Sequence, residues 1–126
     1  MTADQGSQYW RLAEQDMAAA ERLGGAEPLL EQALFHCQQA AEKALKSHIV
    51  TGGTTPPQTH DLLLLVSLGG LGHDAVLNAD AALLRQYSVA PRYPVAGRSF
   101  DRAELAPALA AARRVLDRVQ SVRGQV

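Results

Sequence analysis

Four clusters of turn-forming residues divide this 126-residue sequence into five stretches made mostly of helix formers. The clusters are Gly24-Gly25, GGTTPP at residues 52–57, GGLG at residues 69–72 and PRYPVAG at residues 91–97. No stretch shows sustained alternation of apolar and polar residues, so we expect no strands. The pattern predicts an all-α fold, an antiparallel up-and-down helical bundle of about five helices, in a single domain that spans residues 1–126.

The five predicted helices cover residues 7–23, 27–51, 59–68, 74–87 and 101–122. Pro28 suits the first turn of the second helix, and Thr59 is the expected N-cap of the third. Asp101 and Glu104 resemble a capping box, whereas Pro107 indicates either a kink in the last helix or a later start. Apolar residues at helical spacing predict buried stripes on the first two helices: Trp10, Ala13, Met17 and Ala20 on the first, and Leu30, Leu34, Cys37, Ala41, Leu45 and Ile49 on the second.

Charge and cysteine content narrow the classes of function. The 12 Lys and Arg nearly balance the 13 Asp and Glu, so no global basic field draws the chain to nucleic acid or membrane, and any anion binding must be local. Cys37 is the only cysteine, which excludes an intrachain disulfide and a cysteine-based metal site. We expect a cytoplasmic protein with no signal peptide, membrane span, metal site or cofactor. The alanine-rich helices offer modest apolar volume, so we also expect a homodimer.

The second predicted helix gathers polar residues on one side. His36, Gln39, Lys43 and Lys46 follow one another at spacings of three, four and three, and Gln38 lies beside them with Glu42. A solvated helix face is the ordinary interpretation of such a pattern. The two adjacent glutamines favour the alternative, a binding face, because amides fix a polar partner by direction rather than by charge.

Four blocks of residues, in order, are similar to one family. They are Trp10 with Ala13 and Asp16, then FHCQQAAEKALKSHI from Phe35, then GGTTPPQTHDLLLLV at residues 52–66, and finally YSVAPRYP at residues 87–94. Together they resemble the HEPN (higher eukaryotes and prokaryotes nucleotide-binding) domain family across nearly the whole chain. The resemblance implies an antiparallel helical bundle that is commonly dimeric. It also implies either a partnership with a small nucleotidyltransferase encoded next door or, in other members, a ribonuclease of toxin–antitoxin and defence systems.

Ribonuclease members of that family use an arginine and a histidine that are separated by four to six residues. The arginine binds the phosphate, and the histidine moves protons around the 2′-hydroxyl. None of the four histidines here has an arginine at that spacing; the corresponding region offers Arg85 and then Arg92. Because arginine stays protonated at neutral pH, this pair retains phosphate affinity without a general base. We therefore expect binding rather than catalysis, and assign no catalytic residue.

The candidate ligand-binding residues combine cations, aromatic rings and amides. Arg92 offers a planar fork for phosphate, and Tyr87 and Tyr93 offer faces for a base. The full set is Arg85, Tyr87, Arg92, Tyr93, His36, Gln39, Lys43 and Lys46. The alternatives are structural: Tyr87 as a core aromatic residue, Tyr93-Pro94 as a helix stop, and Arg92 in a salt bridge to Glu42 or Asp61.

Three functions remain open. The first is a nucleotide- or RNA-binding module that works with a nucleotidyltransferase partner. The second is a metal-independent ribonuclease with a non-standard site, in which His60 or His36 supplies proton transfer. The third is a dimerising scaffold. A basic stripe on the last helix, with Arg114 and Arg118 at its centre, could contact nucleic acid, but a solvated face partnered by Asp117 and Glu104 is the simpler interpretation.

Overall fold

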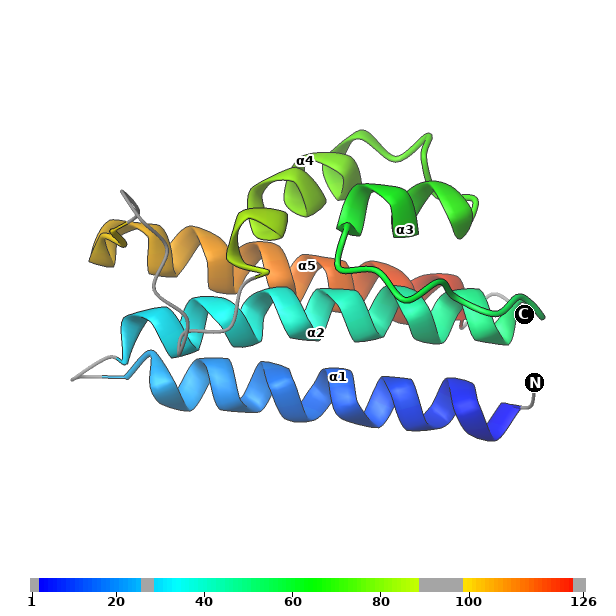
Figure 1. Ribbon diagram of the computed structural model, residues 1–126, viewed down its shortest axis with the longest axis horizontal. Coiled ribbons are helices and arrows are strands. Elements are labelled where there is room, and N and C mark those ends of the chain that lie inside the picture. The colour runs from blue at the N-terminus through cyan, green and yellow to red at the C-terminus, as the bar shows by residue number, and fades with distance from the viewer. Residues whose placement is uncertain (1–2, 26–28, 89–98, 124–126) are drawn as a thin grey trace.

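The fold is all-α, as the turn and periodicity pattern predicts (Figure 1). A computed structural model describes residues 3–25, 29–88 and 99–123, and within these ranges it contains five α-helices and no strand. The helices are α1 (Ala3–Leu23), α2 (Leu30–Thr51), α3 (Leu62–Leu68), α4 (Ala75–Leu84) and α5 (Leu105–Arg123). Two 3₁₀ turns, η1 (Arg85–Tyr87) and η2 (Arg102–Glu104), follow α4 and precede α5.

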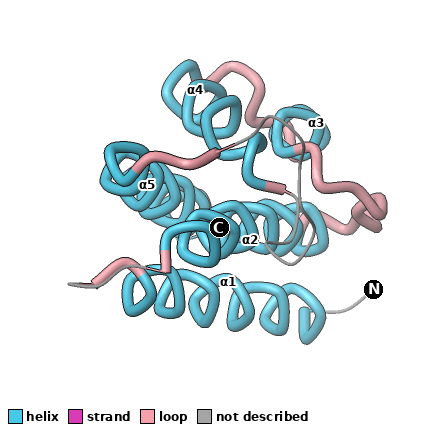
Figure 2. The backbone as a smooth tube through the Cα atoms, turned by 60° about the vertical axis from the view of Figure 1, so that its left-hand side comes forward, coloured by secondary structure: helices cyan, strands magenta, loops and turns pink. Residues whose placement is uncertain are grey.

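The central helix of the bundle is α2. It packs along its length against antiparallel α1 on one side and contacts α5, α3, α4 and η1 on its other sides. Figures 1 and 2 show the shorter α3 and α4 stacked over α2 and α5, on the side away from α1. The loop of residues 52–61 runs back along α2, so α3 begins above the middle of that helix. This return path places His60 beside Gln38 and Glu42 of α2, which are 22 and 18 positions away in the sequence.

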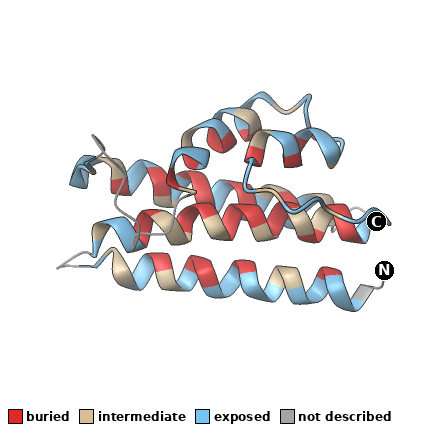
Figure 3. Ribbon diagram, in the orientation of Figure 1, coloured by how far each residue is buried: buried red, intermediate tan, exposed pale blue. Residues whose placement is uncertain are grey.

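The core lies on the facing sides of the helices (Figure 3). The predicted stripes are largely confirmed, because Ala13, Met17, Ala20 and Cys37 are buried, and so are the inward-facing leucines of α2. Trp10 is only partly buried at the edge of this core, with the Arg123 guanidinium 4.9 Å from its ring centroid. Small residues bring α1 and α2 into close contact. A Cβ on Gly6 would lie 2.7 Å from the Thr51 hydroxyl, and the buried Ser47 hydroxyl donates to the Gly6 carbonyl at 2.7 Å.

Helix boundaries differ from the predictions where local side-chain bonds decide them. Thr59 is not the N-cap of α3; Asp61 is, because its carboxylate accepts from the backbone N–H groups of Leu63 and Leu64. The Thr59 hydroxyl instead accepts from the Asp61 backbone, so the helix begins after Asp61 rather than at Thr59. Asp74 caps α4 in the same way, through the Leu77 N–H.

The starts of α2 and α5 follow from backbone geometry and capping. Leu29 has a non-helical backbone (φ −86°, ψ 83°), so α2 begins at Leu30, later than expected; Pro28 lies outside the described residues. The predicted capping box of Asp101 and Glu104 is present, at the 3₁₀ turn η2. α5 then begins at Leu105, which places Pro107 in the first turn. There its missing N–H costs no helical hydrogen bond, so the later start is confirmed.

Paired glycines end α2 and α3. Gly53 and Gly70, each the second of a pair, have positive φ values of 92° and 74°, which favour glycine. Among the described residues, no helix is long and apolar enough to cross a membrane.

Candidate functional site

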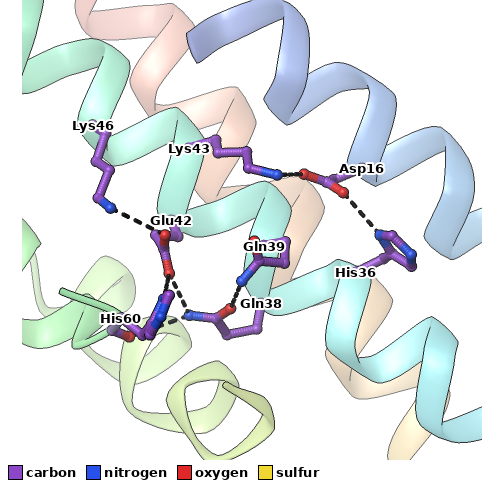
Figure 4. A network of polar contacts seen from close by, with 8 residues as sticks. All are labelled: Asp16, His36, Gln38, Gln39, Glu42, Lys43, Lys46 and His60. Atoms are coloured by element: carbon purple, nitrogen blue, oxygen red, sulfur yellow. Dashed lines mark hydrogen bonds and ion pairs between the residues drawn. The ribbon is translucent and has the colours of Figure 1, made fainter. Parts of the chain in front are cut away.

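Two clusters of polar side chains occupy the two flanks of α2 (Figure 4). Each is organised by one buried carboxylate that accepts from a lysine and a histidine. We name them after the helices that they face. The α1-facing cluster contains Asp16, His36 and Lys43, and the α3-facing cluster contains Gln38, Gln39, Glu42, Lys46 and His60.

The α1-facing cluster joins two long helices. Asp16 of α1 accepts from Lys43 Nζ at 2.5 Å and lies 2.8 Å from His36 Nδ1, both on α2. Lys43 and His36 are seven residues apart, which is two helical turns, so they reach Asp16 from the same side of α2. The His36 side chain is 32% exposed, and that of Lys43 is 24% exposed. The cluster therefore acts as a cross-link between α1 and α2 with limited access to solvent.

The α3-facing cluster centres on Glu42, whose side chain is 6% exposed. One carboxylate oxygen lies 3.1 Å from Lys46 Nζ, and the other lies 2.7 Å from His60 Nδ1. Gln38 Nε2 lies 3.2 Å from the Glu42 oxygen that faces His60. It also donates to the His60 backbone carbonyl at 3.2 Å. Gln39 in turn donates to Gln38 Oε1 at 2.7 Å. The directional hydrogen bonds of these two adjacent glutamines thus hold the His60 backbone and the Glu42 carboxylate in place.

Arg85 approaches this cluster from η1. Its guanidinium lies 3.9 Å from an Asp61 carboxylate oxygen, and both side chains are about half exposed. Asp61 directly follows His60, and η1 contacts α2, so Arg85 belongs to the same junction of α2, α3 and η1. The long distance to Asp61 leaves the guanidinium loosely held compared with the other ion pairs of the fold.

Tyr87 lies in the interior. The side chain is buried, the ring centroid is 5.9 Å from that of Phe100, and the hydroxyl donates to Glu104 at 2.6 Å. This placement fits the alternative that Tyr87 is a core aromatic residue at the end of α4. Arg92 and Tyr93 lie outside the described residues.

Three arginines of α5, namely Arg113, Arg114 and Arg118, are paired, as the simpler interpretation expects, but with other partners. Asp117 and Glu104 were the expected acceptors, whereas Arg114 binds Asp80 in a bidentate pair at 2.8 and 3.0 Å, and Arg118 binds Asp74 at 2.6 Å. The pairing raises the pKa of Arg114. The Leu77 N–H and then Arg118 hold the pKa of Asp74 below its ordinary value of 3.8. These pairs line a groove of about 430 Å³ between α4 and α5 and tie the two helices together.

The remaining histidines and the cysteine have structural surroundings. His48 Nε2 is 2.8 Å from the Gly69 carbonyl and links α2 to the end of α3, and His73 is exposed in the turn before α4. Burial, with a smaller contribution from Glu21, raises the pKa of the Cys37 thiol to about 12, so it is a poor nucleophile. In the described part of the chain, no group of three His, Cys, Asp or Glu is arranged to hold a metal ion.

Sequence reasoning placed the lysines but missed the carboxylates that hold them. Both partners of Asp16 and the His60 partner of Glu42 come from residues 18 to 27 positions away, which helix periodicity does not specify. Only Lys46 and Gln38 lie one helical turn from Glu42. One signal was present: Glu42 stands among Ala40, Ala41, Ala44 and Leu45, where an exposed residue would not be expected. A charged residue in such surroundings is stable only when it is paired.

Comparison with known proteins assigns the family. The HEPN domain model matches residues 7–122. The structure is similar to the crystal structure of TT1696 from Thermus thermophilus, with a TM-score of 0.77 and 26% identity over 93% of this chain and 97% of that one. The archaeal HEPN homologue ST0689 shares the fold at a TM-score of 0.76 and 22% identity, over 92% of this chain and 95% of that one. No curated protein shows a significant match. The chain belongs to the HEPN domain family.

Proposed function

We propose that this HEPN domain is a binding module for a nucleotide or an RNA-like ligand, acting as a homodimer with a small nucleotidyltransferase partner. The ligand site in this proposal is the junction of α2, the residues before α3, and η1. Three segments that are distant in sequence meet there, and each contributes a polar or charged side chain.

The observation that carries the proposal is the state of Arg85. Its side chain is 52% exposed and lies 3.9 Å from Asp61, so the guanidinium can turn toward a phosphate without breaking a tight bond. Lys46 and Lys43 are already held by buried carboxylates, so in this proposal they contribute to the shape and the electrostatic field of the site. Arg92 and Tyr93, seven and eight positions after Arg85, stay in the proposal as further contacts for phosphate and base.

Gln39 and His36 complete the proposed surface. Gln39 is half-buried between the two clusters and donates to Gln38, and its own carbonyl oxygen accepts no hydrogen bond from the residues that the structure describes. His36 lies at the margin of the site, on the α1 flank. In this arrangement Tyr87 supports η1 from the core, and the contacts to ligand come from Arg85 and the segment that follows it.

Exposed apolar side chains support the proposal of a protein partner. Leu64 and Leu68, one turn apart on α3, are 42% and 49% exposed, and Val76 at the start of α4 is 61% exposed. A second copy of the chain would remove such side chains from water. Sedimentation analysis tests the dimer: a purely monomeric chain at micromolar concentration contradicts this part of the proposal.

The test of the whole proposal is mass spectrometry of the protein purified natively from its host, combined with calorimetric titration by nucleotides. We expect a bound nucleotide, a co-purifying nucleotidyltransferase, or both. Purified protein that carries no partner and binds no nucleotide contradicts the proposal and leaves the dimerising scaffold.

One observation favours the second candidate, a metal-independent ribonuclease. Arg85, which no sequence motif pairs with His60, lies 3.9 Å from a carboxylate oxygen of Asp61, the residue that directly follows His60. Incubation with cellular RNA decides the question. Cleavage that disappears in both Arg85→Ala and His60→Asn supports the ribonuclease function. RNA that stays intact at high protein concentration contradicts it.

A further inference from the structure

The orientation of His60 is fixed from one side only. Its Nδ1 lies 2.7 Å from a carboxylate oxygen of Glu42, which only accepts hydrogen bonds, so Nδ1 carries a proton. The other ring nitrogen, Nε2, has no hydrogen-bond partner among the described residues. The His60 side chain is 66% exposed, although the carboxylate that holds it is almost fully buried. The result is a ring that is anchored in the interior and presents Nε2 to solvent.

The charges around His60 balance. Glu42 and Lys46 of α2 form one ion pair, and Asp61, the residue that directly follows His60, forms a second, looser pair with Arg85. With His60 neutral, this group of five side chains has no net charge. With His60 protonated, it carries one positive charge. An anion therefore finds a net attractive field at this junction only when His60 is protonated.

We propose that His60 is the ligand-facing residue of this site, that its Nε2 donates a hydrogen bond to a phosphate oxygen, and that it takes up a proton from solvent when the phosphate binds. Arg85 is the second cation of the site. The inference rests on the proposed function for the chemical class of the ligand. No covalent bond of the ligand changes; the one proton gained by Nε2 comes from the buffer.

Glu42 is the positioning residue for this step. Its carboxylate fixes Nδ1 as the donor and faces the positive charge that develops on the ring, as carboxylates oriented behind histidines do in other sites. Gln38 supports the same geometry by holding the His60 backbone carbonyl. The ring is thereby kept in one orientation before any ligand arrives, which lowers the entropy cost of binding.

Calorimetry at pH 7.5 in two buffers of different ionisation enthalpy tests the proposal. The probes are adenosine 5′-monophosphate and a short 2′-O-methyl RNA without terminal phosphates, which a 2′-hydroxyl mechanism cannot cleave. We expect a buffer-dependent enthalpy that reports proton uptake approaching one per site. We also expect affinity to fall on the order of tenfold between pH 6 and pH 8, because an anion loses one cationic partner when the ring is neutral. Uptake with the monophosphate alone indicates a free nucleotide as the ligand, and uptake with the RNA alone indicates a polynucleotide.

The matched variants are His60→Asn and His73→Asn. Asparagine keeps a side-chain N–H for Glu42 but has no group equivalent to Nε2, so His60→Asn should lose the proton uptake. His73 is exposed in the α3–α4 turn, and its replacement should leave the uptake unchanged. If His60→Asn does not fold, the exposed Arg85→Ala still tests the location, with an expected loss of affinity of about tenfold to a hundredfold.

The outcomes separate this inference from the proposed function. Binding of either probe without proton uptake, or uptake that persists in His60→Asn, overturns the role of His60 and leaves the binding module in place. Unchanged affinity in Arg85→Ala overturns the location. No binding of either probe overturns both.

Discussion

The two flanks of α2 carry the same combination of side chains but differ in their exposure to solvent. On each flank one buried carboxylate accepts from one lysine and one histidine, yet His36 is 32% exposed and His60 is 66% exposed. The difference follows from what lies opposite. α1 covers the first cluster with a continuous helix, whereas only a returning loop covers the second. The same pairing therefore leaves one histidine largely covered and the other largely open to solvent, and it is the open one that we propose as ligand-facing.

The largest expected effect is the loss of either buried carboxylate. Glu42→Ala leaves Lys46, Gln38 and His60 without their acceptor and should lower the free energy of unfolding by about 3–5 kcal/mol. Asp16→Ala should cost less, about 2 kcal/mol, because Lys43 and His36 can turn to water. Urea denaturation measures both. Glu31→Ala, at an exposed position of α2, is the control; equal losses in all three variants contradict the comparison.

The adjacent glutamines give the next effect. Gln38 is fully buried and bonds Glu42, Gln39 and the His60 carbonyl, so Gln38→Ala should cost about 1–3 kcal/mol. Gln39 is half-buried and its side chain donates to Gln38, so Gln39→Ala should cost less than about 1 kcal/mol. If the order of the two is reversed in urea denaturation, the α3-facing cluster is not organised as described.

A third prediction concerns an ion pair outside both clusters. Asp74→Ala removes the N-cap of α4 and the partner of Arg118, at a cost of about 1 kcal/mol at pH 7. Because the folded-state pKa of Asp74 is lowered, its contribution is complete above the ordinary pKa of 3.8 and is lost as pH falls through the folded value.

The measurement for Asp74 is the difference in unfolding free energy between wild type and variant as a function of pH. It should be constant from about pH 7 to pH 5 and shrink below about pH 4. The exposed Asp117→Ala is the control and should show no such change. A difference that grows on acidification contradicts the sign of the pKa shift.

The smallest effect is expected at an exposed pair. Arg113 lies 2.7 Å from Glu21, but both side chains are about half exposed, so the pair is screened by water and salt. Arg113→Ala should change the free energy of unfolding by no more than about 0.5 kcal/mol. A loss of unfolding free energy as large as that of Asp16→Ala would show that exposed and buried ion pairs do not differ in their contribution to stability in the way proposed.

Helical periodicity and turn residues were sufficient to predict the all-α fold and most of its core. Both signals are local, so they also located the capping box at Asp101. The predicted N-cap of α3 was two residues too early, because both Thr59 and Asp61 have side chains that can cap this turn. Only the geometry shows which of the two reaches the backbone N–H groups of the helix.

The site was less predictable for a physical reason. His60 meets Glu42 only because the loop of residues 52–61 doubles back along α2, and no periodic pattern encodes that path. The sequence identified the polar residues of α2 but grouped them on one side, whereas the structure divides them between two flanks. It also did not show that both lysines are held by carboxylates. Likewise, the buried position of Tyr87 depends on packing against Phe100.

The most direct test is the NMR spectrum of the histidine rings during titration with adenosine 5′-monophosphate at pH 7.5. We predict that the Cε1–H resonance of His60 moves toward the position of a protonated ring as the probe saturates, with a smaller shift for His36. A His60 resonance that stays fixed while the probe binds, or a larger movement of His36, would contradict the proposal that the α3-facing flank of this HEPN domain is its ligand site.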